Sequence, residues 1–213
     1  MGSAEIIYNF AHKALLQVLP TAANLARWKK TTNPNCILCK SSLPQTNKHV
    51  LSNCPSAIAL GRYTARHNEI LQIIYIWIKS VVSSEQKVLV DLEDGDGMST
   101  SNLFLHHRPD LAVYDDRNII VLELTICHET NLIKSKDYKI NKYRNIATEL
   151  KSSFADRELK CFSIEVSTLG LISPIDEFCR ACKVHTFPDS LKQNIIRATL
   201  SSSYKIYCNR NFI

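Results

Sequence analysis

The sequence predicts an α/β protein, and both composition and residue pattern support this class. Of 213 residues, 45% are hydrophobic and 22% are charged, which is typical of a folded globular chain. Apolar residues recur with a helical period in the longer segments, whereas shorter segments alternate or run continuously, as strands do. Beyond residue 55 these segments follow the order helix, strand, strand, strand, helix, strand, helix, which predicts a mixed central sheet flanked by helices.

The N-terminal part of the chain is predicted to be helical. Ala4 to Leu19 has apolar residues at helical spacing and ends before a proline, and Ala22 to Lys30 has the pattern of a second, shorter helix. A polar, cysteine-containing stretch follows and has the character of a loop. Ser56 to Val82 is the longest helical pattern. Its polar face carries four residues that can bind ions or phosphates: Arg62, Arg66, His67 and Glu69.

Three strands are predicted after this long helix. Lys87 to Leu92 alternates in polarity, as a half-buried strand does. Asp110 to Tyr114 and Asn118 to Ile126 are joined by a short polar turn, so they predict a hairpin. The second strand of this hairpin consists almost entirely of β-branched residues and leucine, which favours a central position covered on both faces.

The remaining elements complete the α/β pattern and define three parts of the chain. The expected elements are a basic helix at Lys134 to Phe154, a strand at Leu159 to Val166, and helices at Ile175 to Cys182 and Pro188 to Ser201. We expect linker helices at 1–30, a small cysteine-containing module at 31–55 and an α/β domain at 56–213.

Net charge and cysteine content indicate which kinds of binding partner and which cellular compartment to expect for this chain. A net charge of +6 is compatible with a polyanionic partner but does not require one. No run of eighteen apolar residues exists, so we expect no membrane partner. Eight cysteines without a recognisable signal peptide predict a reducing, intracellular compartment, where cysteines bind metals or pack in a core.

The cysteine-containing module has the spacing of a zinc knuckle. Two residues separate Cys36 from Cys39, as in a Cys-x2-Cys turn, and His49 and Cys54 follow. Zinc prefers four such donors in a tetrahedron, and a segment with so few apolar residues needs an ion to hold it together. Two roles are equally open for the module. It grips nucleic acid through nearby lysines, or it holds the neighbouring parts of the chain in register.

A second set of cysteines has weaker metal-ligand character. Cys179 and Cys182 have the same spacing and are followed by His185, but they lie at the end of a predicted helix. Cys208 is the only nearby fourth ligand. We interpret this set as core packing, with a second metal site as the alternative.

A pair of carboxylates marks the predicted hairpin. Asp110 follows Arg108 and Pro109 at the start of the first strand, and Glu123 lies within the second strand. The hairpin is expected to bring the two side chains together, where they can share Mg²⁺ or Mn²⁺ through hard oxygen ligands. Burying Glu123 without a partner is costly, so it requires a cation or hydrogen bonds. A structural salt bridge is the alternative that also meets this requirement.

This pattern resembles the PD-(D/E)-x-K nuclease superfamily of restriction enzymes and Holliday-junction resolvases. Most members carry a lysine two residues after the second acid, where this chain has Thr125. Lys139, Lys142 and Tyr143 lie at i, i+3 and i+4 on the basic helix, so Lys139 is expected to reach the vacant place. The resemblance implies a restriction-endonuclease-like core, a magnesium site at Asp110 and Glu123, and catalytic roles for the three helix residues.

The order of motifs resembles, more narrowly, the C-terminal region of site-specific non-LTR retrotransposon polyproteins with a restriction-like endonuclease. The resemblance runs from about Leu19 onward and implies an enzyme that nicks target DNA in the nucleus and leaves a 3′ hydroxyl that primes reverse transcription. Its implied partners are double-stranded DNA, the element RNA and the reverse transcriptase domain. Glu69 is implied as a further acidic ligand. The implied DNA contacts or supports of the active site are Arg62, Arg66, His67, Arg108, Lys134 and Arg144.

Three other functions remain open at this stage. These alternatives are a non-catalytic nucleic-acid-binding module with a degenerate nuclease fold, a structure-specific resolvase of branched DNA, and an interaction scaffold held together by zinc. No helix-turn-helix or tandem finger array is recognisable, so contacts to the DNA backbone are expected to dominate. The isolated chain is therefore expected to cut with weak sequence specificity.

Overall fold

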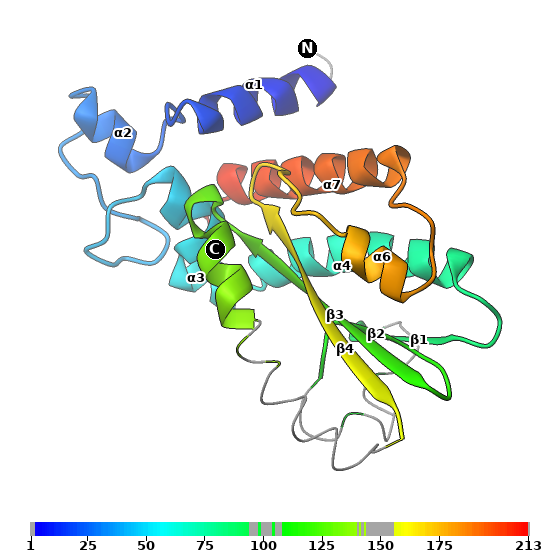
Figure 1. Cartoon of the computed structure of the whole chain (residues 1–213). Helices are drawn as coiled ribbons and strands as arrows, with labels where there is room; N and C mark the ends of the chain where they lie inside the picture. Colours follow the sequence, from blue (N-terminus) through cyan, green and yellow to red (C-terminus); the bar gives the residue numbers. More distant parts are fainter. Residues whose placement is uncertain are drawn as a thin grey trace.

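The fold is a mixed four-stranded sheet packed between helices, with a small helical domain at one end (Figure 1). The computed structural model describes residues 3–93, 98, 104, 108–139, 141, 143 and 156–212. Its elements in chain order are α1 (Ser3–Leu15), α2 (Ala22–Arg27), η1 (His49–Asn53), α3 (Pro55–Ala59), α4 (Arg62–Val81), β1 (Lys87–Val90), β2 (Leu111–Tyr114), β3 (Asn118–Cys127), η3 (Glu129–Asn131), β4 (Glu158–Ser167), α6 (Asp176–Ala181) and α7 (Asp189–Cys208).

The sheet has the order β1-β2-β3-β4. Strands β1, β2 and β3 are antiparallel neighbours, and β4 runs parallel to β3 along its whole length. The predicted hairpin is confirmed, with Leu111 paired to Leu122 and a turn in which Asp115 accepts hydrogen bonds from two backbone N–H groups. The prediction that β3 is central and covered on both faces is also confirmed, because six consecutive residues from Ile119 are buried.

Two apolar clusters lie on opposite faces of the sheet. The larger one combines side chains of α4, α6 and α7 with alternate strand residues such as Leu122 and Ile164. The smaller one packs Met98, Phe104 and Tyr143 against the other face, around Val121. Residues 132–139 are helical, begin directly after η3 and lie in front of this second face in Figure 1. The part of the predicted basic helix at 144–155 lies outside the described residues.

Several helix boundaries differ from the prediction: α1 and α2 end at Leu15 and Arg27, before the predicted Leu19 and Lys30. Gly61 has φ of +67°, a conformation that side-chain-bearing residues rarely adopt, and it divides the predicted single helix into α3 and α4. At the other end of the chain, α7 continues past Ser201 to Cys208. Serines favour helices weakly, but Ser202 bonds to Glu69, and Ser203 bonds to the carbonyl of Thr168. Tertiary contacts therefore override the local preference.

The N-terminal helices pack against the C-terminal one. Phe10 of α1 contacts the rings of Tyr204 and Tyr207 of α7, with centroids 5.5 and 5.6 Å apart. Figure 1 shows α1 lying along α7, so segments from the two ends of the sequence are neighbours in space. Among the described residues, no helix combines the length and hydropathy needed to cross a membrane.

Candidate metal sites

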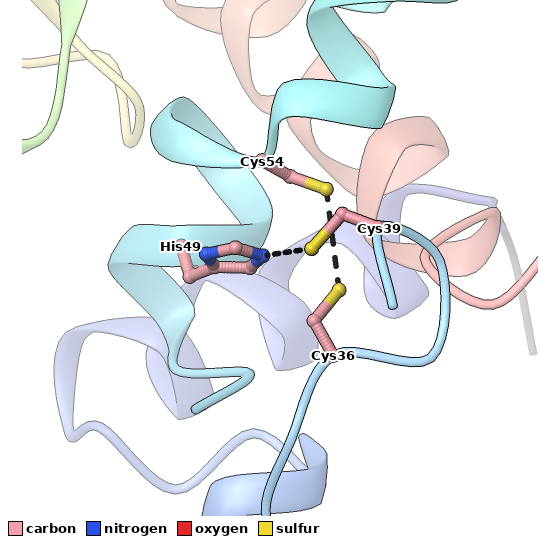
Figure 2. Close-up of side chains that lie close together, drawn as sticks. All are labelled: Cys36, Cys39, His49 and Cys54. Atoms are coloured by element: carbon pink, nitrogen blue, oxygen red, sulfur yellow. Dashed lines mark hydrogen bonds between the residues drawn. The ribbon is translucent and has the colours of Figure 1, made fainter. Parts of the chain in front are cut away.

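The four predicted zinc ligands converge on one point. The donor atoms of Cys36, Cys39, His49 and Cys54 all lie within 4.8 Å of one another. The sulfurs of Cys36 and Cys54 are 3.9 Å apart, and the Cys39 sulfur lies 3.5 Å from Nε2 of His49 (Figure 2). In tetrahedral coordination, sulfur ligands at usual Zn–S lengths are about 3.8 Å apart. The donor set therefore fits a single zinc ion.

Local backbone contacts orient these four donor atoms toward one another. A bridge between Asn35 and Pro44 closes the loop that carries the first two cysteines. Lys40, the residue after Cys39, adopts a left-handed conformation (φ of 51°) that turns the chain back. His49 and Cys54 bracket the short helix η1, and the hydroxyl of Thr46 accepts a hydrogen bond from the backbone N–H of His49. Figure 2 shows the imidazole and the three sulfurs pointing toward one another.

The electrostatics of this cluster favour a bound cation. Burial, with a smaller contribution from the neighbouring thiols of Cys36 and Cys39, raises the pKa of Cys54 to about 11. Burial lowers the pKa of His49, which keeps the imidazole in the neutral form that binds metals. Three thiols placed together repel one another once ionised, and a divalent cation removes that repulsion. The residues therefore suit zinc in charge as well as in geometry.

Comparison with known protein families bears directly on this domain. Residues 6–60 match the zf-RVT family, described as zinc-binding in reverse transcriptase. No curated protein matches the chain. The matched segment contains all four ligands and extends back through α1 and α2, further than the predicted module at 31–55. The chain thus carries a zinc-binding domain of the reverse transcriptase type, and the prediction of zinc is supported by both the match and the geometry.

The zinc-binding domain is attached to the α/β domain by polar contacts. Lys48 donates hydrogen bonds to Thr130 and Asn131 of η3, each 3.1 Å long. Arg66 of α4 is 1% exposed, and its guanidinium donates hydrogen bonds to the carbonyl of Leu51 in η1 and to the hydroxyl of Ser203 in α7. These contacts favour the second of the two predicted roles, in which the module holds neighbouring parts in register.

The second cysteine set does not assemble. Cys179 and Cys182 are buried in the larger apolar cluster, and burial raises the pKa of Cys182 to about 12. Cys208 is exposed at the end of α7. Within the described part of the chain, the four ligands of the zinc-binding domain form the only group of three or more potential metal donors. The interpretation of Cys179 and Cys182 as core residues fits this arrangement.

The two predicted carboxylates lie opposite each other at the end of the hairpin. Because Leu111 pairs with Leu122, Asp110 and Glu123 are the next facing pair. Oδ2 of Asp110 accepts a hydrogen bond of 2.7 Å from the backbone N–H of Leu124. This bond fixes the first carboxylate against the backbone that carries the second one.

Lys139 contacts the second carboxylate. Its Nζ forms an ion pair with Oε2 of Glu123, whose side chain is 3% exposed. The lysine comes from the helix at residues 132–139, whereas Thr125 occupies the place two residues after the acid. The structure therefore joins Lys139 to Glu123 and places Asp110 at the facing position of the hairpin. The roles of Asp110, Glu123 and Lys139 in catalysis remain predictions.

His67 supports Asp110 from helix α4. Its Nε2 lies 3.3 Å from Oδ2 of Asp110 and 3.3 Å from the carbonyl oxygen of Leu124. Burial lowers the pKa of His67, but the hydrogen bond and negative charge of Asp110 outweigh burial, so the net pKa is raised above its ordinary value. His67 thus acts on the carboxylate and lies beside the site.

Other predicted site residues have different surroundings. Arg66 is buried in the interior, as described above, which suits a support and not a DNA contact. Glu69 accepts a hydrogen bond from Ser202 of α7, and it does not form a group of metal donors with Asp110 and Glu123 among the described residues.

The remaining predicted site residues have other partners or lie outside the described residues. Arg108 forms an ion pair with Asp91. Arg62 donates to two backbone carbonyls near the end of α7, and the phenol of Tyr143 is buried in the smaller cluster. Lys142 and Arg144 lie outside the described residues.

A pocket opens beside the ion pair of Glu123 and Lys139. It is lined by one side of the helix at 132–139 and by the strand residue Thr125. Its lining residues are Thr125, Asn131, Lys134, Ser135, Tyr138 and Lys139. Sequence reasoning identified Lys134 and Lys139 but missed the polar residues between them, because their proximity to Thr125 depends on how the helix packs on the sheet.

Proposed function

We propose that the chain is a Mg²⁺-dependent DNA endonuclease that nicks target DNA and leaves a 3′ hydroxyl able to prime reverse transcription. The observation that carries the proposal is the ion pair of Lys139 with Glu123, together with Asp110 at the position facing Glu123 on the hairpin. A mixed sheet with helices on both faces is compatible with a restriction-endonuclease-like core. The Lys139 contact supports the idea that this lysine replaces the one absent at position 125.

The carboxylates of Asp110 and Glu123 are the groups that would hold the cation. Among the described residues, Oδ1 of Asp110 accepts no hydrogen bond, so this oxygen remains available for a ligand. When bound, Mg²⁺ supplies charge stabilisation to the phosphate and lowers the pKa of a water. His67 and the N–H of Leu124 hold Asp110 in place while it does so.

The adjacent pocket suits a phosphodiester group. Lys134 is exposed on the helix at its edge, and Lys139 reaches from the same helix to Glu123. Two lysines on one wall attract a phosphate, and Ser135 and Asn131 offer hydrogen bonds to its oxygens. With a cation bound at Glu123, Lys139 would be able to contact the phosphate and stabilise the negative charge that develops there.

The zinc-binding domain supports the retrotransposon context. Its match is described as zinc-binding in reverse transcriptase, and it lies directly before the proposed nuclease core. On this basis the proposed partners are double-stranded DNA, the element RNA and a reverse transcriptase domain, and the proposed compartment is the nucleus. The positive net charge is consistent with the nucleic acid partners.

A nicking assay on supercoiled plasmid tests the proposal. In Mg²⁺ the parent is expected to nick the plasmid, and Asp110→Asn to lower the rate by about 100-fold or more, because the isosteric amide cannot hold the cation as a carboxylate does. Asp116→Asn, in the exposed turn of the same hairpin, is the matched control and should keep the parental rate.

Other results would favour the alternative functions. A parent that binds DNA but never nicks it in Mg²⁺ or Mn²⁺ would indicate a non-catalytic binding module. Preferential cleavage of a four-way junction over linear duplex of the same sequence would indicate a structure-specific resolvase. Equal nicking by the parent and Asp110→Asn would exclude the proposed site.

A further inference from the structure

A third carboxylate lies buried next to the proposed nuclease site. Glu165 of β4 is 2% exposed, and its Oε1 has no hydrogen-bond partner within the described part of the chain. Glu165 pairs directly with Thr125 of β3, whose hydroxyl oxygen is also buried without a partner. Two paired residues thus each carry a buried polar atom without a hydrogen-bond partner, a combination that is rare in native proteins.

These two residues lie on the same face of the sheet as Glu123. Leu122 and Leu124 of β3, with Ile164 of β4, point into the larger apolar cluster. Side chains alternate along a strand, so Glu123, Thr125 and Glu165 project from the opposite face, toward the helix at 132–139. Glu123 pairs with Ser163, which makes Glu165 its diagonal neighbour one step along the parallel ladder.

The pocket beside Lys139 extends to one member of this pair. Thr125 is the one strand residue among the pocket's lining residues, and Glu165 is its partner on β4. No basic side chain forms an ion pair with Glu165 among the described residues, whereas Glu123 has Lys139. An unpaired carboxylate held out of water is unfavourable unless a cation or a proton accompanies it.

We propose that Glu165 and the hydroxyl of Thr125 hold a second divalent cation next to the one at Asp110 and Glu123. Carboxylate and hydroxyl oxygens are hard donors, as Mg²⁺ and Mn²⁺ require. In two-metal phosphodiesterases the ions are about 3.5–4 Å apart, a separation that diagonal neighbours on a sheet can bridge. This inference rests on the proposed nuclease function and extends it, because Thr125, which stands where most superfamily members carry lysine, then belongs to the site as a ligand.

Counting bound Mn²⁺ by electron paramagnetic resonance on the zinc-loaded full chain tests the inference. The parent is expected to bind two Mn²⁺ ions per chain, and Glu165→Gln one. Glu158→Gln, at the exposed end of the same strand, should bind as many as the parent. If Glu165→Gln binds the same number of ions as the parent, the inference is wrong, and Glu165 is satisfied by a proton or a water molecule.

A second variant tests the inference independently, in case Glu165→Gln has a folding defect. Thr125→Val keeps the shape of the side chain and removes the hydroxyl, and it should weaken the second Mn²⁺ by about tenfold while the first is retained. Unchanged Mn²⁺ affinity in this variant would also contradict the inference. Nicking reports separately on the proposed function. If Asp110→Asn abolishes nicking and Glu165→Gln leaves the Mn²⁺ count unchanged, the nuclease stands without the second ion.

Discussion

The zinc centre and the carboxylate site differ in what completes them. Three thiols and an imidazole converge in the zinc centre with no cationic side chain among them, whereas Glu123 in the carboxylate site already has Lys139. The first cluster is electrostatically incomplete without its ion, and the second is neutralised by the protein itself. We therefore expect zinc to be a structural component and magnesium to be an exchangeable ligand that competes with a lysine.

Loss of a zinc ligand should have the largest effect on stability. Cys36→Ser removes one of four donors, and structural zinc contributes on the order of 10 kcal/mol to folding. We expect zinc content to fall well below one ion per chain and the free energy of unfolding to fall by more than about 4 kcal/mol. Metal analysis and denaturant unfolding measure the two quantities.

Cys208→Ser is the matched control, because this cysteine is exposed on α7. Removing Mg²⁺ from the parent should, in contrast, leave its unfolding curve nearly unchanged. If removing magnesium lowered the free energy of unfolding as much as losing a zinc ligand, magnesium would be structural as well, and the two sites would not differ in this way.

Arg66 connects the two regions, and its loss should rank second. Burial lowers the pKa of this arginine to about 10, yet its guanidinium bonds to the Leu51 carbonyl and to Ser203. Arg66→Met leaves the Leu51 carbonyl buried without this donor, so we expect the free energy of unfolding to fall by about 3 kcal/mol. Arg180→Met, on the exposed face of α6, should change it by less than about 0.5 kcal/mol. Chemical denaturation with zinc present compares the two.

Lys139→Met should separate stability from metal binding. Without Mg²⁺ it leaves Glu123 buried without its ion-pair partner, and we expect a loss of about 2 kcal/mol. Mg²⁺ should bind this variant more tightly than the parent, because the competing lysine is gone, while nicking is lost. Calorimetric titration with Mg²⁺ gives the affinity. Weaker binding in the variant would show that Lys139 does not compete with the cation.

The smallest expected effect is a pH dependence at His67. Its pKa in the folded chain is raised by Asp110, so its stabilising contribution is fully present below its ordinary pKa of about 6.5. That contribution disappears as pH rises through the higher folded value. With Mg²⁺ omitted, His67→Gln should therefore lose less stability than the parent between pH 6 and pH 8. His185→Gln, at an exposed position, should follow the parental curve in thermal unfolding.

The zinc ligands and the hairpin were predictable from sequence because each depends on local spacing. Two cysteines on one turn and a ten-residue apolar strand leave few alternatives. The approach of Lys139 to Glu123 was also predictable, since an acid in a buried strand needs a partner and the helix beyond it is basic. Glu165 was not predicted, because its importance depends on the parallel register that pairs it with Thr125. Nor was the interior position of Arg66, which depends on helix packing.

The contacts between α1 and α7 have a consequence for synthesis of the chain. Phe10 packs on Tyr204, the Pro20 carbonyl accepts a hydrogen bond from Arg210 across 190 residues, and Gln45 donates one to Asn211 across 166 residues. The zinc ligands emerge from the ribosome long before these partners do, by a delay on the order of ten seconds at usual elongation rates. During that interval the nascent domain has its ion and short-range contacts, such as the hydrogen bonds that Ala22 donates to Gln45 and Asn47 donates to Ala14, but not its contacts with the C-terminal segment. Metal supply at translation would therefore influence how much of the protein escapes aggregation.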